Sequence, residues 1–156
     1  MAPPPAPMAP PPATMAGVRP MGATVITVIE AILGVLLSIV ALGALFLGSI
    51  AGGLGGLSNV ENGAAVGGIL AGVGFFFGII AVLIASLYFA IAYGVWKGRS
   101  WAWMLGMIVS IIAIVFGVLG LSGGVSVGSI VSLALPIVVV YFLWQPDVKR
   151  WLGRPA

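Results

Sequence analysis

The sequence predicts an all-α membrane protein: a bundle of four antiparallel transmembrane helices with both termini in the cytoplasm. Of its 156 residues, 62% are hydrophobic and only 6% are charged, whereas about 25% of a typical soluble domain is charged. Four long apolar stretches follow one another along the chain, and all six lysines and arginines fall on one side of them. Because so small a molecule cannot hide this much apolar material from water, its solvent must be lipid.

The chain divides into three parts. Residues 1–18 form a tail rich in proline and alanine and without charge, a composition that favours a disordered, extended chain over a packed core. Residues 19–145 contain the transmembrane domain. Residues 146–156 form a short basic segment at the membrane interface.

The four spans follow from length and composition. Residues 23–47 form the first span, interrupted only by Glu30. At 1.5 Å per residue, about 20 residues cross a hydrocarbon core of about 30 Å, so this stretch can cross with some tilt. The other spans contain no charged residue and are expected at about 72–96, 101–121 and 127–144.

The links between the spans differ in length and composition. Residues 97–100 form a short link, which makes the second and third spans antiparallel neighbours. Residues 48–65 are rich in glycine and contain the turn signal Asn62-Gly63. They are therefore expected to form a long outer loop.

The positive charges predict the orientation. They precede the first span, separate the second from the third, or follow the fourth: Arg19, Lys97, Arg99, Lys149, Arg150 and Arg154. Cytoplasmic loops of membrane proteins carry an excess of lysine and arginine, and indole rings prefer the headgroup layer. We therefore expect a multi-pass protein of the cell membrane with both termini in the cytoplasm. Its interfacial anchors are Trp96, Lys97, Arg99, Trp101, Trp103, Trp144, Lys149, Arg150 and Trp151.

The C-terminal segment has the pattern of a short helix. Pro146 and Asp147 are typical of a helix start, and Gly153 is typical of a helix end. One apolar face at helical spacing is formed by Val148, Trp151 and Leu152. We expect this segment to lie along the membrane surface, with weak, salt-sensitive contacts to anionic headgroups.

Three segments carry a family resemblance. They are residues 19–25 (RPMGATV), with Glu30 in the span that follows, residues 92–103 (AYGVWKGRSWAW) and residues 141–149 (YFLWQPDVK). Together they resemble a group of small four-helix membrane proteins of archaea and bacteria that are labelled only as domains of unknown function. The resemblance covers residues 19–153 and implies the same fold and location. Since no activity is assigned to that group, it implies no catalytic residue.

Glycines recur at four-residue spacing in and before the second span. They form the motifs Gly68-x-x-x-Gly72 and Gly74-x-x-x-Gly78. Small residues one turn apart let helix backbones approach closely, so all four glycines are expected to pack against another helix. That helix belongs either to the same chain or to a second copy.

Glu30 is the one ionisable residue inside an expected span, and such residues face the interior of a bundle. Counted inward from the cytoplasmic aromatic layer, Glu30, Tyr88 and Ser110 lie seven or eight residues from Ala23, Trp96 and Trp103 respectively, about 10 to 12 Å deep at 1.5 Å per residue. Because a buried carboxyl needs hydrogen-bond partners, the sequence predicts a polar cluster of these three residues. The cluster either stabilises the bundle or binds a cation or proton.

The available side chains limit the chemistry. Neither cysteine nor histidine occurs, which removes disulfides, thiolates and the commonest acid-base catalyst. The three acidic residues are too far apart in the expected topology for a paired-carboxylate site. Six scattered cations do not make a nucleic-acid-binding stripe. We therefore expect no enzymatic activity, no metal site, no cofactor and no nucleic-acid partner.

Two functions of different class remain. The first is a non-enzymatic scaffold or accessory subunit, which acts in the bilayer through helix packing with a second copy or with another membrane protein. The alternative is a small channel or carrier in which Glu30 binds a cation or proton.

Overall fold

The computed structural model describes residues 18–57, 62–122, 124 and 126–155, so nearly all of the expected N-terminal tail lies outside the described residues. Within the described part, four helices are long enough and apolar enough to cross a membrane. They are α1, Met21–Leu57; α2, Gly63–Trp96; α3, Ser100–Leu121; and α4, Val127–Trp144. A short helix follows them, α5, Pro146–Trp151.

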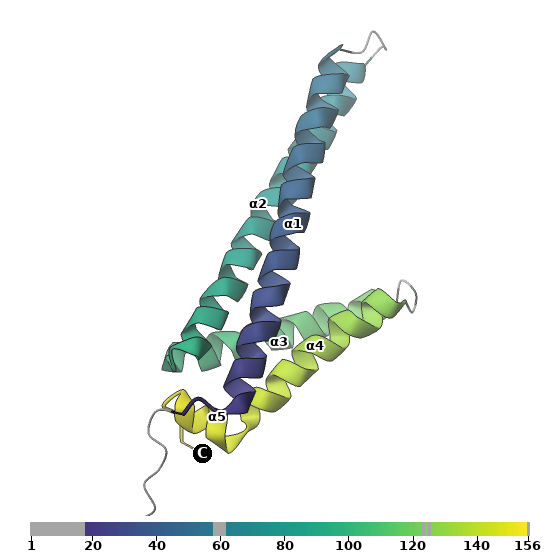
Figure 1. Cartoon of the computed structure of the whole chain (residues 1–156). Coiled ribbons are helices and arrows are strands. Elements are labelled where there is room, and N and C mark those ends of the chain that lie inside the picture. Colours follow the sequence, from purple (N-terminus) through teal and green to yellow (C-terminus); the bar gives the residue numbers. More distant parts are fainter. Residues whose placement is uncertain (1–17, 58–61, 123, 125, 156) are drawn as a thin grey trace, which may run out of the picture.

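The long helices form two antiparallel hairpins that meet at one end of the molecule (Figure 1). α1 and α2 form the first hairpin, which has the most extensive contacts in the structure. α3 and α4 form the second hairpin, which diverges from the first. We call the end where the hairpins meet, together with α5, the basal end, and the end with the two hairpin turns the distal end.

Small residues let α1 and α2 pack backbone against backbone. A Cβ atom added to Gly67 would lie 2.5 Å from the Cα of Gly55, and one added to Gly74 would lie 2.9 Å from the Cα of Gly48. A larger side chain does not fit at such distances. The close approach brings long stretches of backbone into van der Waals contact without large side chains between them.

The loop expected at residues 48–65 is a wrong prediction, because most of it is helical. α1 continues to Leu57, and α2 begins at Gly63. Glycine weakens a helix in water, which is why the glycine run predicted a loop. In an apolar solvent, however, each backbone N–H and C=O needs a partner within the protein, and here the glycines also permit the helix contact. The turn signal itself holds, since Asn62 has a φ of 67° directly before α2.

The two hairpins differ in length. At 1.5 Å per residue, the 37 residues of α1 and the 34 residues of α2 extend about 55 and 51 Å. The 22 residues of α3 and the 18 residues of α4 extend about 33 and 27 Å. The second hairpin therefore matches a hydrocarbon core of about 30 Å, and the first exceeds it.

The buried core lies at the basal end and joins both hairpins to α5. Its residues are Ala23, Ile26, Ile91, Val95, Ala102, Val139, Leu143, Val148 and Leu152. Val148 and Leu152 come from the C-terminal segment, where α5 starts at Pro146 and Gly153 follows with a φ of 68°. The predicted start, end and apolar face of this helix are thus present.

Two indole rings tie the basal end together. The Nε1–H of Trp103 donates a hydrogen bond to the carbonyl of Leu143 at 3.0 Å, which links α3 to α4. The Nε1–H of Trp151 donates to the carbonyl of Val95 at 2.9 Å, which links the end of α5 to α2. Both are predicted interfacial anchors, and their N–H groups bond to the protein itself.

Candidate functional site

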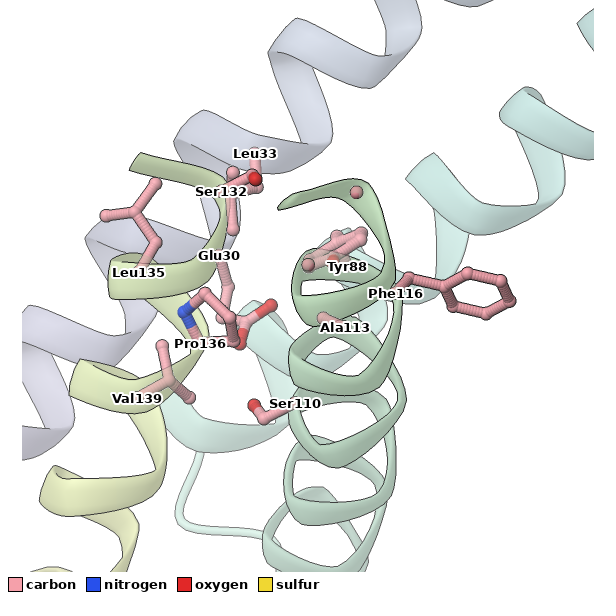
Figure 2. Close-up of a pocket in the computed structure, with 12 residues that line it drawn as sticks. Glu30, Leu33, Tyr88, Ser110, Ala113, Phe116, Ser132, Leu135, Pro136 and Val139 are labelled. Carbon is pink, nitrogen blue, oxygen red and sulfur yellow. The ribbon is translucent and has the colours of Figure 1, made fainter. Parts of the chain in front are cut away.

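A cavity of about 330 Å³ lies between the two hairpins, next to the basal core (Figure 2). All four long helices contribute to its lining. Apolar walls are formed by Leu33, Ala113, Leu135 and Val139. Polar side chains are supplied by Glu30, Tyr88, Ser110 and Ser132.

Glu30 supplies the carboxyl group of this cavity. It lies nine residues after the start of α1, about 14 Å along the helix, and its side chain is only 1% exposed. Figure 2 shows its carboxylate directed into the space between α3 and α4. The Oε2 atom is buried and has no hydrogen-bond partner in the described structure. An orphaned buried acceptor is costly and calls for an explanation.

The structure brings Glu30, Tyr88 and Ser110 to one cavity from three different helices. Ser110 is 3% exposed, and Figure 2 shows its hydroxyl on the α3 side of the space that Glu30 enters. The expectation that hydroxyls satisfy the carboxyl is not met at Oε2. The reason is geometric, since these side chains border a cavity and do not close on one another.

The fourth helix adds polar atoms that the sequence pattern left unassigned. Ser132 and Pro136 both line the cavity, and α4 continues through the proline. Because proline has no N–H, the carbonyl of Ser132 lacks its usual helical donor. The Ser132 hydroxyl donates to the carbonyl of Ser129 at 2.9 Å, and its lone pairs can still accept. Among the described residues, the cavity therefore gathers oxygen acceptors without a cationic side chain.

The four glycines of the predicted packing motifs divide into two pairs. Gly74 and Gly78 face α1, where their neighbours are Gly48 and Leu45. A Cβ added to either of the other two, Gly68 and Gly72, would meet no atom of the described residues within 4 Å outside its own helix and adjacent residues. Among the described residues these two therefore have no packing partner, and their packing against a second copy stays a prediction. Six residues separate Gly68 from Gly74, about 600° of helix rotation, so the two motifs lie on different faces.

The predicted interfacial anchors all lie at the basal end, in or beside the helix ends that meet there. Cations stack on three indole rings: Arg19 on Trp96 at 3.3 Å, Lys149 on Trp144 at 5.3 Å, and Arg154 on Trp103 at 5.2 Å. Such contacts hold a cation over the electron-rich face of the ring. One acidic group is present among the described residues here, Asp147, and it pairs with Arg150.

Comparison with known proteins identifies the family. The family model described as "Predicted membrane protein (DUF2127)" matches residues 68–146, half of the chain. The chain belongs to this family. Neither the curated proteins nor the solved structures give a significant match.

The DUF2127 assignment confirms the resemblance to uncharacterised membrane proteins. Its match runs from within α2 to the first residue of α5. It therefore includes Tyr88, Ser110, Ser132 and Pro136 and begins after Glu30. The family description identifies a membrane protein and names no activity. The chemistry of the cavity has to be argued from its own residues.

Proposed function

We propose that this DUF2127 protein is a small membrane carrier that binds a cation in the cavity between the hairpins, with Glu30 as the binding group. The proposal rests on the unpartnered Oε2 of a carboxyl that is 1% exposed and borders a cavity of about 330 Å³. A carboxyl that served only packing would be better paired or replaced by an apolar side chain. A bound cation would supply the missing partner.

The basal core favours a carrier over an open channel. Ile26, Ile91 and Val95 are fully buried and belong to the core that adjoins the cavity at the basal end. A cation bound at Glu30 could leave toward that end only after the hairpins shift. Alternating opening toward the two sides is the mechanism of carriers.

The proposed role is binding without catalysis. Glu30 is the one acidic side chain among the described lining residues, and Asp147 is engaged with Arg150 at the basal end. General acid-base catalysis most often uses histidine or a second carboxyl group beside the first, and the described lining contains neither. A single carboxyl among hydroxyls and apolar walls is better suited to holding a cation.

The test is cation flux into liposomes that contain the purified protein, driven by a diffusion potential and followed with entrapped dyes for protons and for small cations. The unaltered protein should raise the flux of a cation above that of empty liposomes. Glu30→Gln should return it to that baseline, because the amide carries no charge. Asp147→Asn is the matched control, since it removes the same charge from the basal end. Equal flux with Glu30→Gln and with the unaltered protein would contradict the proposal.

We further propose that the carrier is a cell-membrane protein with both termini in the cytoplasm. Support comes from the six cations, which all accompany the basal helix ends, while the sequence at the two distal turns contains none. A reporter fused after the last residue, or inserted at Gly98, should report the cytoplasm. A reporter at Asn62 should report the outside. An outside C-terminus would overturn this orientation.

A second candidate is a scaffold that acts through helix packing, favoured by the excess length of the first hairpin. Near its distal end, Ile69 is 67% exposed, and on the same side of α2 Gly68 and Gly72 leave the adjoining surface flat. Such a surface fits a second copy of the chain. The unaltered protein should then be dimeric in detergent by light scattering, and Gly68→Leu should make it monomeric. Gly43→Leu is the control at another open position, and a monomeric unaltered protein removes this candidate.

A further inference from the structure

The cavity has two ends of different character. The inner end holds Glu30 and Ser110, which are 1% and 3% exposed. At the outer end lie Phe116, Gly120 and Ser132, which are exposed on α3 and α4, and Figure 2 shows the Phe116 ring turned away from the cavity. The exposed surface of a membrane-spanning helix faces lipid. The outer end therefore opens sideways to the bilayer.

The oxygens near the inner end suit one kind of cation. Glu30 offers a carboxylate, and Ser110 and Tyr88 each add a hydroxyl to the same lining. A primary ammonium group has three N–H donors and no acceptor, and its bonds to a carboxylate are charge-assisted. Calcium takes six to eight oxygen ligands, and magnesium demands a near-ideal octahedron. One carboxylate and two hydroxyls match the ammonium better than either ion.

The rest of the cavity suits an apolar body. Leu33, Ala113, Leu135 and Val139 form the remaining walls. The volume of about 330 Å³ falls within the range of small-molecule pockets, about 300 to 1,000 Å³. A ligand with its charge at the inner end would place its apolar part along these walls, toward the opening to the bilayer.

Building on the proposed function, we infer that the bound cation is a primary ammonium on an apolar body, a lipophilic amine that enters sideways from the bilayer. The ammonium donates to the Glu30 carboxylate and to the Ser110 and Tyr88 hydroxyls. The apolar part remains within the membrane during binding. The amine therefore does not have to pass through water to reach the site.

The experiment measures saturable binding of radiolabelled octylamine to the full chain in phosphatidylcholine nanodiscs, with binding to empty nanodiscs subtracted. Unlabelled octylamine should displace the label. Octyltrimethylammonium has the charge without N–H donors. It should displace the label only at a concentration at least about tenfold higher than that of unlabelled octylamine, because it lacks the charge-assisted hydrogen bonds. 1-Octanol, which has no charge, should displace nothing.

Variants connect this binding to the named residues. Glu30→Gln should abolish saturable binding, Ser110→Ala should weaken it severalfold, and Asp147→Asn should leave it unchanged. Helix content and the thermal midpoint of each variant show whether it is folded. Glu30→Leu provides a second test should Glu30→Gln fail to fold, and it should likewise abolish saturable binding. Displacement by octanol as effective as by octylamine would overturn the inference.

The outcomes separate this inference from the proposed function. Flux of protons or metal cations that depends on Glu30, without saturable octylamine binding, overturns the amine and leaves the carrier. Octylamine binding that depends on Glu30, without any flux of cations or of octylamine, overturns the carrier and leaves the site. Equal octylamine binding by Glu30→Gln and by the unaltered protein overturns the amine at Glu30, and the dependence of cation flux on Glu30 then decides the carrier separately. Nanodiscs with added phosphatidylethanolamine identify the source of the ammonium group. Competition from this lipid would point to an aminolipid headgroup, and a lack of competition would point to a free amine.

Discussion

The two hairpins solve the same problem, holding two apolar helices together, in different ways. In the first, glycines bring the backbones of α1 and α2 into contact at Gly48 and Gly74 and at Gly55 and Gly67. In the second, side chains connect α3 and α4: Leu133 packs on Gly117, and the indole of Trp103 donates a hydrogen bond to the Leu143 carbonyl. Backbone contact at glycines therefore holds the first hairpin together, and side-chain contacts hold the second.

The difference teaches where the molecule can hold a ligand. Backbone contact leaves no room between α1 and α2 along the glycine interface, whereas α3 and α4 contribute nine of the twelve lining residues of the cavity. Glu30 comes from the first hairpin but points toward the second (Figure 2). The tightly packed hairpin thus supplies the charge, and the loosely packed one supplies most of the walls.

The largest effect is expected from breaking the glycine interface. Gly67→Val places side-chain atoms where a Cβ alone would already lie 2.5 Å from Gly55, so the helices must separate. Overpacking of this kind costs about 1 to 3 kcal/mol or more. We therefore expect the free energy of unfolding, measured by steric trapping in detergent, to fall by about 3 kcal/mol. Gly68→Val makes the same change at the next residue, where no neighbour lies within 4 Å, and should cost well under 1 kcal/mol. Equal losses would refute backbone contact as the basis of the hairpin.

A gain of stability is expected at the junction between the hairpins. Glu30→Leu removes a buried oxygen that has no partner, so the free energy of unfolding should rise by about 1 to 3 kcal/mol, the usual cost of such a group. Glu30→Gln keeps a polar atom there and should change it by less. Thermal denaturation of both variants in the same detergent provides the measurement. A loss of stability in Glu30→Leu would show that the carboxyl is bonded after all.

A moderate effect is expected from the indole bond of the second hairpin. Trp103→Phe removes the donor to the Leu143 carbonyl and keeps most of the ring, so it should cost about 1 kcal/mol. Trp144→Phe is the matched control, because Trp144 lies exposed at the same end of the molecule. The difference between the two variants, measured by chemical denaturation, isolates the hydrogen bond. No difference would place the stability of this hairpin in its apolar side chains alone.

The smallest effect is expected at the close glycine contact of the second hairpin. In Gly117→Ala the added Cβ would lie 3.1 Å from the Cδ1 of Leu133, the end of a side chain that can move. Since alanine also favours the helix, the net change should remain within about 0.5 kcal/mol. Gly120→Ala, with nothing within 4 Å, serves as the control. A cost near that of Gly67→Val would mean that both hairpins depend on backbone contact.

Much of the fold could be predicted because it depends on single segments. Length and apolar composition give four membrane helices, and the short link at residues 97–100 gives one pair of antiparallel neighbours. The extension of α1 to Leu57 could not be predicted, since a glycine run predicts a loop in water and a close contact when a partner helix is present. Which of these applies is a property of two helices together.

The candidate site shows the same division. Glu30, Tyr88 and Ser110 could be assigned to one level because depth along a helix is a count of residues. The cavity, and with it the roles of Ser132 and Leu135, could not be assigned, because both depend on how far α3 and α4 diverge from α1. No periodicity in the sequence encodes that angle.

Because the two hairpins are joined at the basal end, a small rotation there produces a large displacement at their distal ends. The core that joins the hairpins lies at the basal end, while α1 extends about 55 Å from it. A rotation of 5° at this pivot would move the distal tip of α1 by about 5 Å, by the geometry of a rod of that length. The cavity lies next to the pivot, so a ligand that changes the angle there by a few degrees would be detectable as a change of several ångströms between the two distal turns.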